Sequence, residues 1–201
     1  MVVHVDEVLH FYENAQEAVG RQVRAAADGA LWPGPTPCSD WSVRELANHV
    51  ASEQLWAPAL LAGRTVAEVG DRFDGDVLGD DPAGVWTQCA AAALAAFAEP
   101  GALQRTVHLS YGERPALDYC REMTVDAIVH AWDLAVGVGA DAGIDPAAAE
   151  FALAQVTPYA DGLASSGVFG PPVPVPPGAD AQTRLLGLLG RDPADPLHTA
   201  G

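Results

Sequence analysis

The segment ALDYCREMTVDAIVHAWDLAVGV, residues 116 to 138, has the hydrophobic spacing of one long helix. Its apolar residues recur at helical intervals and would lie along one side of that helix. These residues are Met123, Ala127, Ile128, Ala131, Leu134 and Ala135. Gly137 and Gly139 favour an end to the helix there. A helix of this length can cross a whole domain, so we expect the other elements to pack around it.

Three upstream segments also predict helices. Residues 5 to about 27 show the same helical hydrophobic spacing. Residues 42 to about 62 open with SVRE, in which Ser42 and Glu45 form a capping-box pattern. Residues 81 to about 99 open with an aspartate and a proline, which suit the N-cap and the first turn of an alanine-rich helix. Together with the central segment, they make four long helices.

Four long helices with a proline-rich connection at residues 31 to 40 predict an all-α fold, an up-down antiparallel four-helix bundle. Between the third and fourth helices, residues 105 to 117 predict either a short hairpin or an irregular crossover. Additional C-terminal helices are predicted from 145 to about 163, with a bend at Pro158, and from 181 to about 189.

The length of 201 residues predicts a single domain over residues 1 to 201. Its bundle core would span about 5 to 139, and a C-terminal extension about 145 to 190. The formal charge of −17 repels phosphate backbones, so nucleic acid is not an expected partner. We find no apolar run of the roughly 20 residues that a membrane span needs and no signal-peptide pattern, so we expect a cytoplasmic protein with no membrane partner.

The cysteines at positions 38, 89 and 120 lack CxxC spacing, so neither a disulfide framework nor a cysteine zinc site follows. We interpret each as a small buried or half-buried thiol. A thiolate nucleophile is the minority interpretation, since none has an obvious base beside it in the sequence.

Asp126 and His130 form the first candidate site. Residues four apart lie on one face of a helix, so their carboxylate and imidazole groups would stand side by side. Their neighbours in the sequence are mostly apolar, and burying such a pair is costly unless it has partners. The pair is also a common helix-surface contact, so its spacing alone leaves a metal site and a simple ion pair open.

His49 has a similar apolar setting on the second predicted helix, and a bundle can bring it against the fourth. Two histidines and a carboxylate leave coordination positions open, as in catalytic zinc sites, and iron or nickel would also accept them. Glu53, four residues after His49, is the alternative carboxylate ligand.

Three residues near these candidates are predicted to support the site. Asp133, three residues after His130, is a candidate to contact the imidazole from outside the ligand set and orient it, or else a solvated charge. Trp132 and Trp41 are candidates to line the pocket, although an aromatic residue in a bundle more often belongs to the core. No catalytic residue is assigned from the sequence.

Three segments are distinctive when taken together: TPCSDWSVRELANHV (36 to 50), VDAIVHAWDLA (125 to 135) and RLLGLLGRDP (184 to 193). They resemble the actinobacterial maleylpyruvate isomerase-like family, which belongs to the DinB-like metal-binding four-helix bundles. The resemblance covers nearly the whole chain. It implies a divalent metal centre, zinc by preference.

The resemblance also implies which residues hold the metal. The family's ligands are a histidine in the first segment and an acidic residue and a histidine in the second, which correspond to His49, Asp126 and His130. The family's acid is more often glutamate. The aspartate here is a departure from that pattern, and it keeps Glu53 as an alternative ligand.

Similar proteins use mycothiol as a cofactor in isomerisation or as the nucleophile in thiol transfer. The resemblance therefore implies a mycothiol-dependent isomerase or S-transferase that acts on a small electrophilic metabolite. The isomerase itself has a further C-terminal domain with a catalytic arginine, which this chain does not match, so maleylpyruvate is not the expected substrate. Arg105, His108 and Arg121 are the candidates for orienting an anionic substrate instead, with surface solvation as the alternative role.

Two other functions stay open. One is a thiol-independent metal-dependent lyase, isomerase or hydrolase, and the other is a non-catalytic bundle that binds a metal or a small ligand. The alanine-rich helix faces are compatible with a homodimer.

Overall fold

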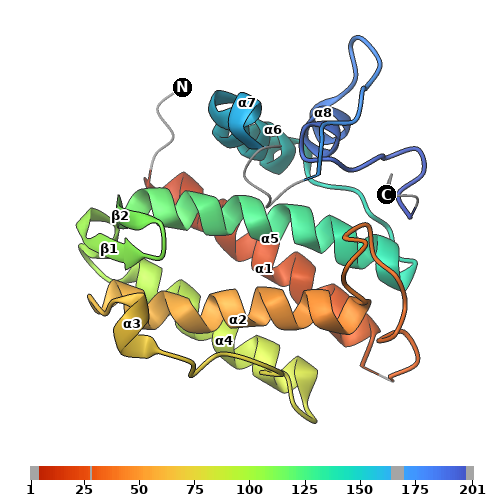
Figure 1. Cartoon of the computed structure of the whole chain (residues 1–201). Coiled ribbons are helices and arrows are strands. Elements are labelled where there is room, and N and C mark those ends of the chain that lie inside the picture. The colour runs from red at the N-terminus through yellow and green to blue at the C-terminus, as the bar shows by residue number, and fades with distance from the viewer. Residues whose placement is uncertain (1–4, 28, 164–169, 198–201) are drawn as a thin grey trace.

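The four longest helices form a bundle in the computed structural model, which describes residues 5–27, 29–163 and 170–197 (Figure 1). These helices are α1 (Val5–Ala25), α2 (Val43–Leu61), α4 (Pro82–Ala98) and α5 (Ala116–Val138). α5 packs against both α1 and α2, and α4 packs against the same two helices from the other side. The predicted helical bundle is confirmed.

The long connection from 62 to 81 determines the direction of α4. It runs back along α2, since Ser52 donates a hydrogen bond to the Phe73 carbonyl (3.1 Å) and Arg44 donates one to the Gly79 carbonyl (2.8 Å). The chain therefore returns to the end of the bundle where α2 began. α2 and α4 run in one direction, and α1 and α5 run in the opposite direction (Figure 1). The predicted up-down alternation of consecutive helices is therefore corrected to an up-down-down-up order, because the connection from 62 to 81 carries the chain back along α2 before α4 begins.

Two helices begin with the same reciprocal cap. Ser42 accepts a hydrogen bond from the Glu45 amide (3.3 Å), and the Glu45 carboxylate accepts one from the Ser42 amide (2.8 Å), as the capping-box pattern predicts. A short helix, α3 (Val66–Val69), has an equivalent cap between Thr65 and Glu68. α3 was not predicted, although the T-x-x-E signature of its cap is present in the sequence.

We expect Ser42→Ala to lower the free energy of unfolding by about 1 kcal/mol, because the first turn of α2 loses its side-chain acceptor. For a chain of this size the melting temperature would fall by about 2–4 °C. Thermal and urea unfolding measure both changes. Ser110→Ala, in the exposed turn between the two strands, is the control. A Ser42→Ala protein as stable as this control would contradict the stabilising role of the cap.

The segment between α4 and α5 contains a 3₁₀ turn, η1 (Ala102–Gln104), and a small hairpin. Strands β1 (Thr106–Leu109) and β2 (Gly112–Pro115) pair antiparallel in register across their length. The structure thus selects the hairpin over the irregular crossover. The fold is mostly helical with this one small sheet within the described part of the chain.

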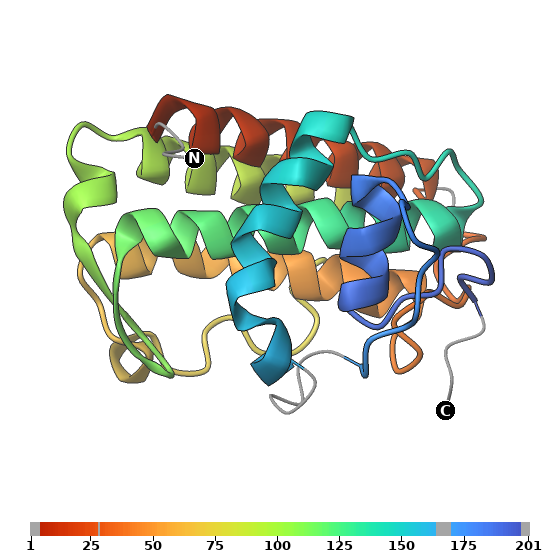
Figure 2. The same ribbon diagram turned by 90° about the horizontal axis from the view of Figure 1, so that it is seen from above.

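The C-terminal elements lie over α5 on the outside of the bundle (Figure 2). They comprise α6 (Pro146–Val156), η2 (Thr157–Tyr159), α7 (Ala160–Leu163) and α8 (Ala181–Leu188). The predicted helix from 145 to 163 is interrupted at Pro158, which lacks an amide proton and crowds the preceding turn. α6 and α8 pack against each other, so the extension forms a layer of its own on α5.

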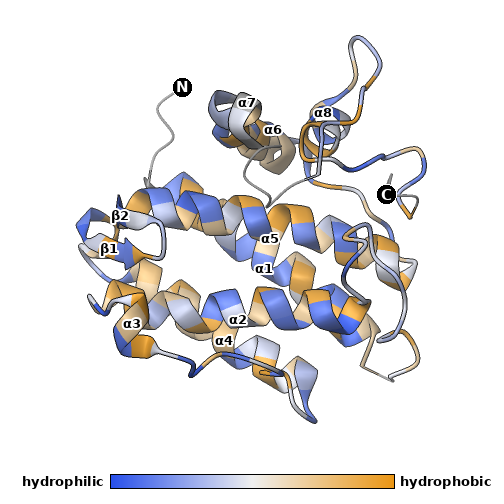
Figure 3. Ribbon diagram, in the orientation of Figure 1, coloured by the Kyte–Doolittle hydropathy of each residue, from blue (hydrophilic) through white to orange (hydrophobic). Residues whose placement is uncertain are grey.

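The long helices carry both hydrophobic and hydrophilic residues, as expected for helices that share a core (Figure 3). Within the described residues, none of the helices has both the length and the apolar character that a membrane crossing needs. α5 is covered by α1, α2 and the C-terminal layer, and it buries the imidazole-bearing His130 and the carboxylate-bearing Asp133, at 7% and 0% exposed. Buried groups of this kind require partners.

Candidate metal centre

The structure brings together the three residues predicted as metal ligands. His49 from α2 and Asp126 and His130 from α5 each offer one ligand atom, and these atoms lie within 4.8 Å of one another. The His130 Nε2 atom is 3.3 Å from the Asp126 Oδ1 atom, and the rings of His49 and His130 have centroids 5.3 Å apart. Two antiparallel helices thus present their polar side chains to one point.

The donor set fits a divalent metal ion. Two imidazoles and one carboxylate are common ligands of zinc and of other first-row metals. The Asp126 Oδ2 atom is buried and has no hydrogen-bond partner among the described residues. An unpaired buried carboxylate oxygen is costly, and a cation held between the three side chains would satisfy it.

Glu53 does not belong to the group of ligand atoms found within the described residues. Burial and the nearby negative charge of Asp126 raise the pKa of its carboxyl to about 7. The geometry therefore favours Asp126 over Glu53 as the third ligand.

Trp41 lies on the open side of the site. Its ring centroid is 4.6 Å from that of His49 and 6.2 Å from that of His130.

Burial lowers the pKa of His49 below its ordinary value, which favours the neutral imidazole, the form that binds metals.

Asp133 contacts the opposite nitrogen of His130. Its Oδ2 atom lies 2.9 Å from His130 Nδ1, so the Nε2 atom is left to face Asp126 and His49. Burial opposes ionisation of Asp133, but the charge of Arg191 and the hydrogen bond with His130 outweigh it and lower the pKa of the carboxyl. Such carboxylate contacts fix the orientation of metal-binding histidines.

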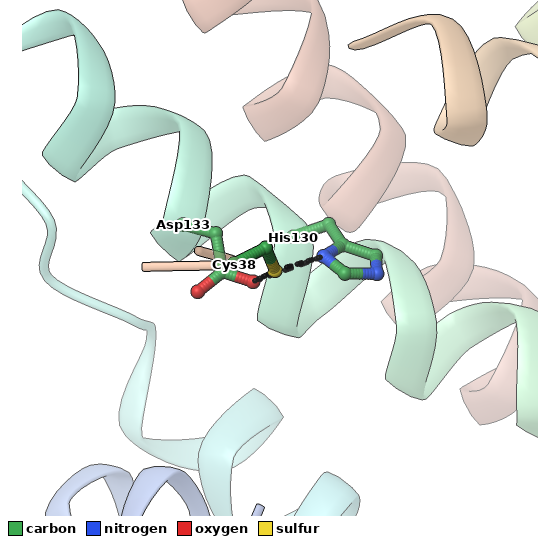
Figure 4. A group of neighbouring side chains, drawn as sticks. All are labelled: Cys38, His130 and Asp133. Carbon is green, nitrogen blue, oxygen red and sulfur yellow. Dashed lines mark hydrogen bonds and ion pairs between the residues drawn. The ribbon is translucent and has the colours of Figure 1, made fainter. Parts of the chain in front are cut away.

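Cys38 lies beside the same carboxylate. Figure 4 shows Cys38 and Asp133 on the Nδ1 side of the His130 ring. The Cys38 thiol donates to Asp133 Oδ2 over 3.3 Å and lies 4.0 Å from His130 Nδ1. Arg191 Nη2 donates to both Asp133 Oδ2 (2.9 Å) and the Cys38 sulfur (3.2 Å).

The group of Cys38, His130 and Asp133 also has the donor atoms for a metal. The guanidinium of Arg191 nevertheless contacts two of those three donors, so a cation there would meet a fixed positive charge at close range. We therefore interpret this group as a hydrogen-bonded support for His130, with the candidate metal site on its Nε2 side.

A cavity of about 430 Å³ opens beside His49. It is lined by Trp41, Arg44, Glu45, Asn48, His49, Gly75 and Asp76. Its wall is held by the connection that follows α2, because Arg44 pairs with Asp76 (2.7 Å) and Asn48 donates to the Gly75 carbonyl (2.8 Å). The cavity offers an aromatic face and charges of both signs next to a candidate ligand.

Four residues that the sequence analysis placed near the site have other contacts. Trp132 lines a second cavity of about 280 Å³, formed with α1 and the residues before α6. Arg105 binds Glu99 (2.9 Å) and the Leu61 carbonyl (3.1 Å). His108 lies 3.4 Å from Glu113, and Arg121 pairs with Asp118 at 2.9 Å. The substrate-orienting roles of Arg105, His108 and Arg121 stay predictions.

Cys38 and Arg191 were not predicted to belong to the site. Each of them belonged to a distinctive segment, 36 to 50 and 184 to 193. That was the available signal, since no spacing rule connects residues 153 positions apart.

The chain is similar to two uncharacterized proteins from two strains of Mycobacterium tuberculosis, MT0763 and Rv0738. Each is 37% identical over 117 residues, a match that covers 56% of this chain and 58% of the relative. It thus spans little more than half the length of these relatives. No solved structure matches the chain. The family model of the mycothiol maleylpyruvate isomerase N-terminal domain matches residues 13–135, and the chain belongs to that family of DinB-like domains.

Proposed function

We propose that the protein is a metal-dependent enzyme of small-thiol chemistry, which uses mycothiol and acts on a small electrophilic metabolite. His49, Asp126 and His130 would hold the metal, zinc by preference. The observation that carries the proposal is the convergence of their three ligand atoms within 4.8 Å of one another. The family supplies the connection to mycothiol.

Three protein ligands leave a coordination position open, as in catalytic zinc sites. Zinc bound there would supply a Lewis acid that stabilises a coordinated thiolate at neutral pH. The cavity beside His49 supports this role, because its 430 Å³ falls within the usual range for small-molecule sites.

The chain's own residues would contribute binding and proton transfer. The Trp41 ring covers His49 and excludes water from that side of the imidazole. Arg44, paired with Asp76 at 2.7 Å, would hold the cavity wall in place beside the bound cosubstrate. The Glu53 carboxyl, with its pKa raised to about 7 by burial and by Asp126, can hold or release a proton near the site.

The test begins with metal analysis of the purified protein and of His49→Ala. We expect one equivalent of metal in the wild type and a large loss in the variant, because one imidazole ligand is removed. Mycothiol consumption with a bimane electrophile should follow metal content in both proteins. His10→Ala, which removes an exposed histidine of α1, is the control and should retain metal and activity.

Each alternative function has its own result in this experiment. Metal-dependent turnover without mycothiol would favour a thiol-independent lyase, isomerase or hydrolase. Stoichiometric metal with no turnover would favour a non-catalytic bundle that binds a metal or small ligand. A wild type that binds no divalent metal would contradict the proposal.

A further inference from the structure

Arg191 reaches the candidate metal centre from the C-terminal layer. The residue is 7% exposed, although arginine is rarely buried without a partner. Two of its nitrogens bind the Asp133 carboxylate, with Nη2 2.9 Å from Oδ2 and Nε 3.3 Å from Oδ1. Nη1 donates to the Leu189 carbonyl over 2.8 Å. This two-point contact fixes the carboxylate plane as well as its position.

The backbone around Arg191 is itself well anchored. Leu185, Leu186 and Leu189 are fully buried, and the Arg191 amide donates to the Leu186 carbonyl over 2.9 Å. Gly190 has a φ of +81°, and a side chain there would meet the backbone of Gly170 at 2.9 Å. The end of α8 therefore turns sharply and directs the next residue toward α5.

The contacts continue from Arg191 to the candidate metal ligands. Asp133 Oδ2 binds both Arg191 Nη2 and His130 Nδ1, each at 2.9 Å. The other ring nitrogen of His130 lies in the group formed with His49 and Asp126. The Arg191 guanidinium thus fixes the position of the Asp133 carboxylate, and this carboxylate fixes the orientation of the His130 imidazole.

This arrangement does not suit an arginine that binds substrate. Its guanidinium is buried, and its charge is directed at Asp133, which is itself 0% exposed. The cavity beside His49 is lined by other residues. The geometry is that of a group that acts on the site through its neighbour.

We infer that Arg191 is a positioning residue of the metal centre and that attachment of the C-terminal segment 181–197 is coupled to metal binding. The inference rests on the proposed function, since it needs a metal at His49, Asp126 and His130. Coupling between two binding events is reciprocal. If attachment of the segment through Arg191 strengthens metal binding by some factor, metal binding strengthens that attachment by the same factor.

The first test compares the zinc affinity of the wild type, Arg191→Gln and Arg191→Lys by competition with a chelator. Changes in outer groups of metal sites commonly cost about 10–100-fold in affinity, and we expect a loss in this range for Arg191→Gln. Lysine retains the charge but not the two-point contact, so Arg191→Lys should recover part of the loss. Arg184→Gln, at an exposed arginine of α8, should stay within about twofold of the wild type.

A second readout separates positioning from a general loss of structure. The absorption spectrum of the cobalt-substituted protein reports the geometry of the metal ligands. It should change in Arg191→Gln and stay unchanged in Arg184→Gln. Amide hydrogen exchange in residues 181–197 should become slower when zinc is added to the wild type, and this effect should be lost in Arg191→Gln.

The outcomes distinguish this inference from the proposed function. Wild-type affinity and an unchanged cobalt spectrum in Arg191→Gln would overturn the inference, while zinc binding that depends on His49 would leave the proposed function standing. A wild type without zinc binding would remove both. If Arg191→Gln does not fold, the wild type alone tests the coupling. Amide hydrogen exchange in residues 181–197 that is the same with and without zinc would overturn it.

Discussion

Asp133→Ala is expected to lower the free energy of unfolding by about 3–5 kcal/mol, the usual effect of removing one partner from a buried ion pair. Asp133 is 0% exposed and accepts hydrogen bonds from Arg191 and Cys38 while it also contacts His130 Nδ1. Alanine would leave the Arg191 guanidinium in a buried position without this carboxylate. At about 2–4 °C per kcal/mol, the melting temperature should fall by at least about 6 °C.

A paired change identifies the cause of that loss. Replacing a buried ion pair by apolar residues of similar volume is often neutral or stabilising. The double variant Asp133→Leu with Arg191→Met should therefore recover most of the stability that Asp133→Ala loses. It should not recover all of it, because His130 Nδ1 stays without its acceptor, at a cost of about 1–3 kcal/mol.

Urea unfolding of Asp133→Ala, of the single changes Asp133→Leu and Arg191→Met, of their double variant and of the wild type measures these differences. The effects of Asp133→Leu and Arg191→Met should not add up to the effect of the double change, because the two residues touch. A loss below about 1 kcal/mol in Asp133→Ala would refute a buried ion pair at this position.

Much of the bundle could be predicted from the sequence because its signals are local. The spacing of apolar residues in 116–138 and the capping pattern at Ser42 act within one helix turn or two. The placement of Asp133 against His130 follows from the same local geometry, since residues three apart share a helix face. By the same geometry, Trp132 points elsewhere, since successive side chains on a helix are turned by about 100°.

The part of the site that was missed depends on the path of the chain through space. Arg191 follows α8, and Cys38 belongs to the proline-rich connection before α2. No periodicity relates these two segments to α5. Their meeting at Asp133 follows from how the C-terminal layer packs on the bundle, which is a matter of tertiary contacts.

The grouping of His49 with Asp126 and His130 is intermediate between these cases. The Asp126 and His130 pair is a local feature, whereas the approach of His49 needs α2 and α5 to be neighbours in the correct register. Bundle topology makes this approach possible without fixing the register. The family resemblance supplied the missing information, and the structure places the three ligand atoms together.

The choice between Asp126 and Glu53 as third ligand leads to the other large expected effect. Zinc in structural sites is bound with about 10–16 kcal/mol, so one protein ligand of three represents roughly 3–5 kcal/mol. We therefore expect Asp126→Asn to weaken zinc binding by about 10²–10³-fold. The variant keeps the size of the side chain and removes the negative charge of the carboxylate that lies beside His49 and His130.

Glu53→Gln is the matched comparison, since it removes the same charge from the neighbouring carboxyl. We expect zinc affinity to stay within about tenfold of the wild type, because Glu53 lies outside the group of converging ligand atoms. Glu13→Gln, at an exposed position of α1, controls for the change in net charge. Chelator competition measures all three variants.

The pattern of losses assigns the ligand. A large loss in Asp126→Asn alone supports the set of His49, Asp126 and His130. A large loss in Glu53→Gln alone would assign Glu53 instead, and the Asp126 carboxylate would then act only on His130 through their 3.3 Å contact. Large losses in both would indicate two carboxylate ligands, which would leave fewer open positions for a thiol and weaken the case for thiol chemistry.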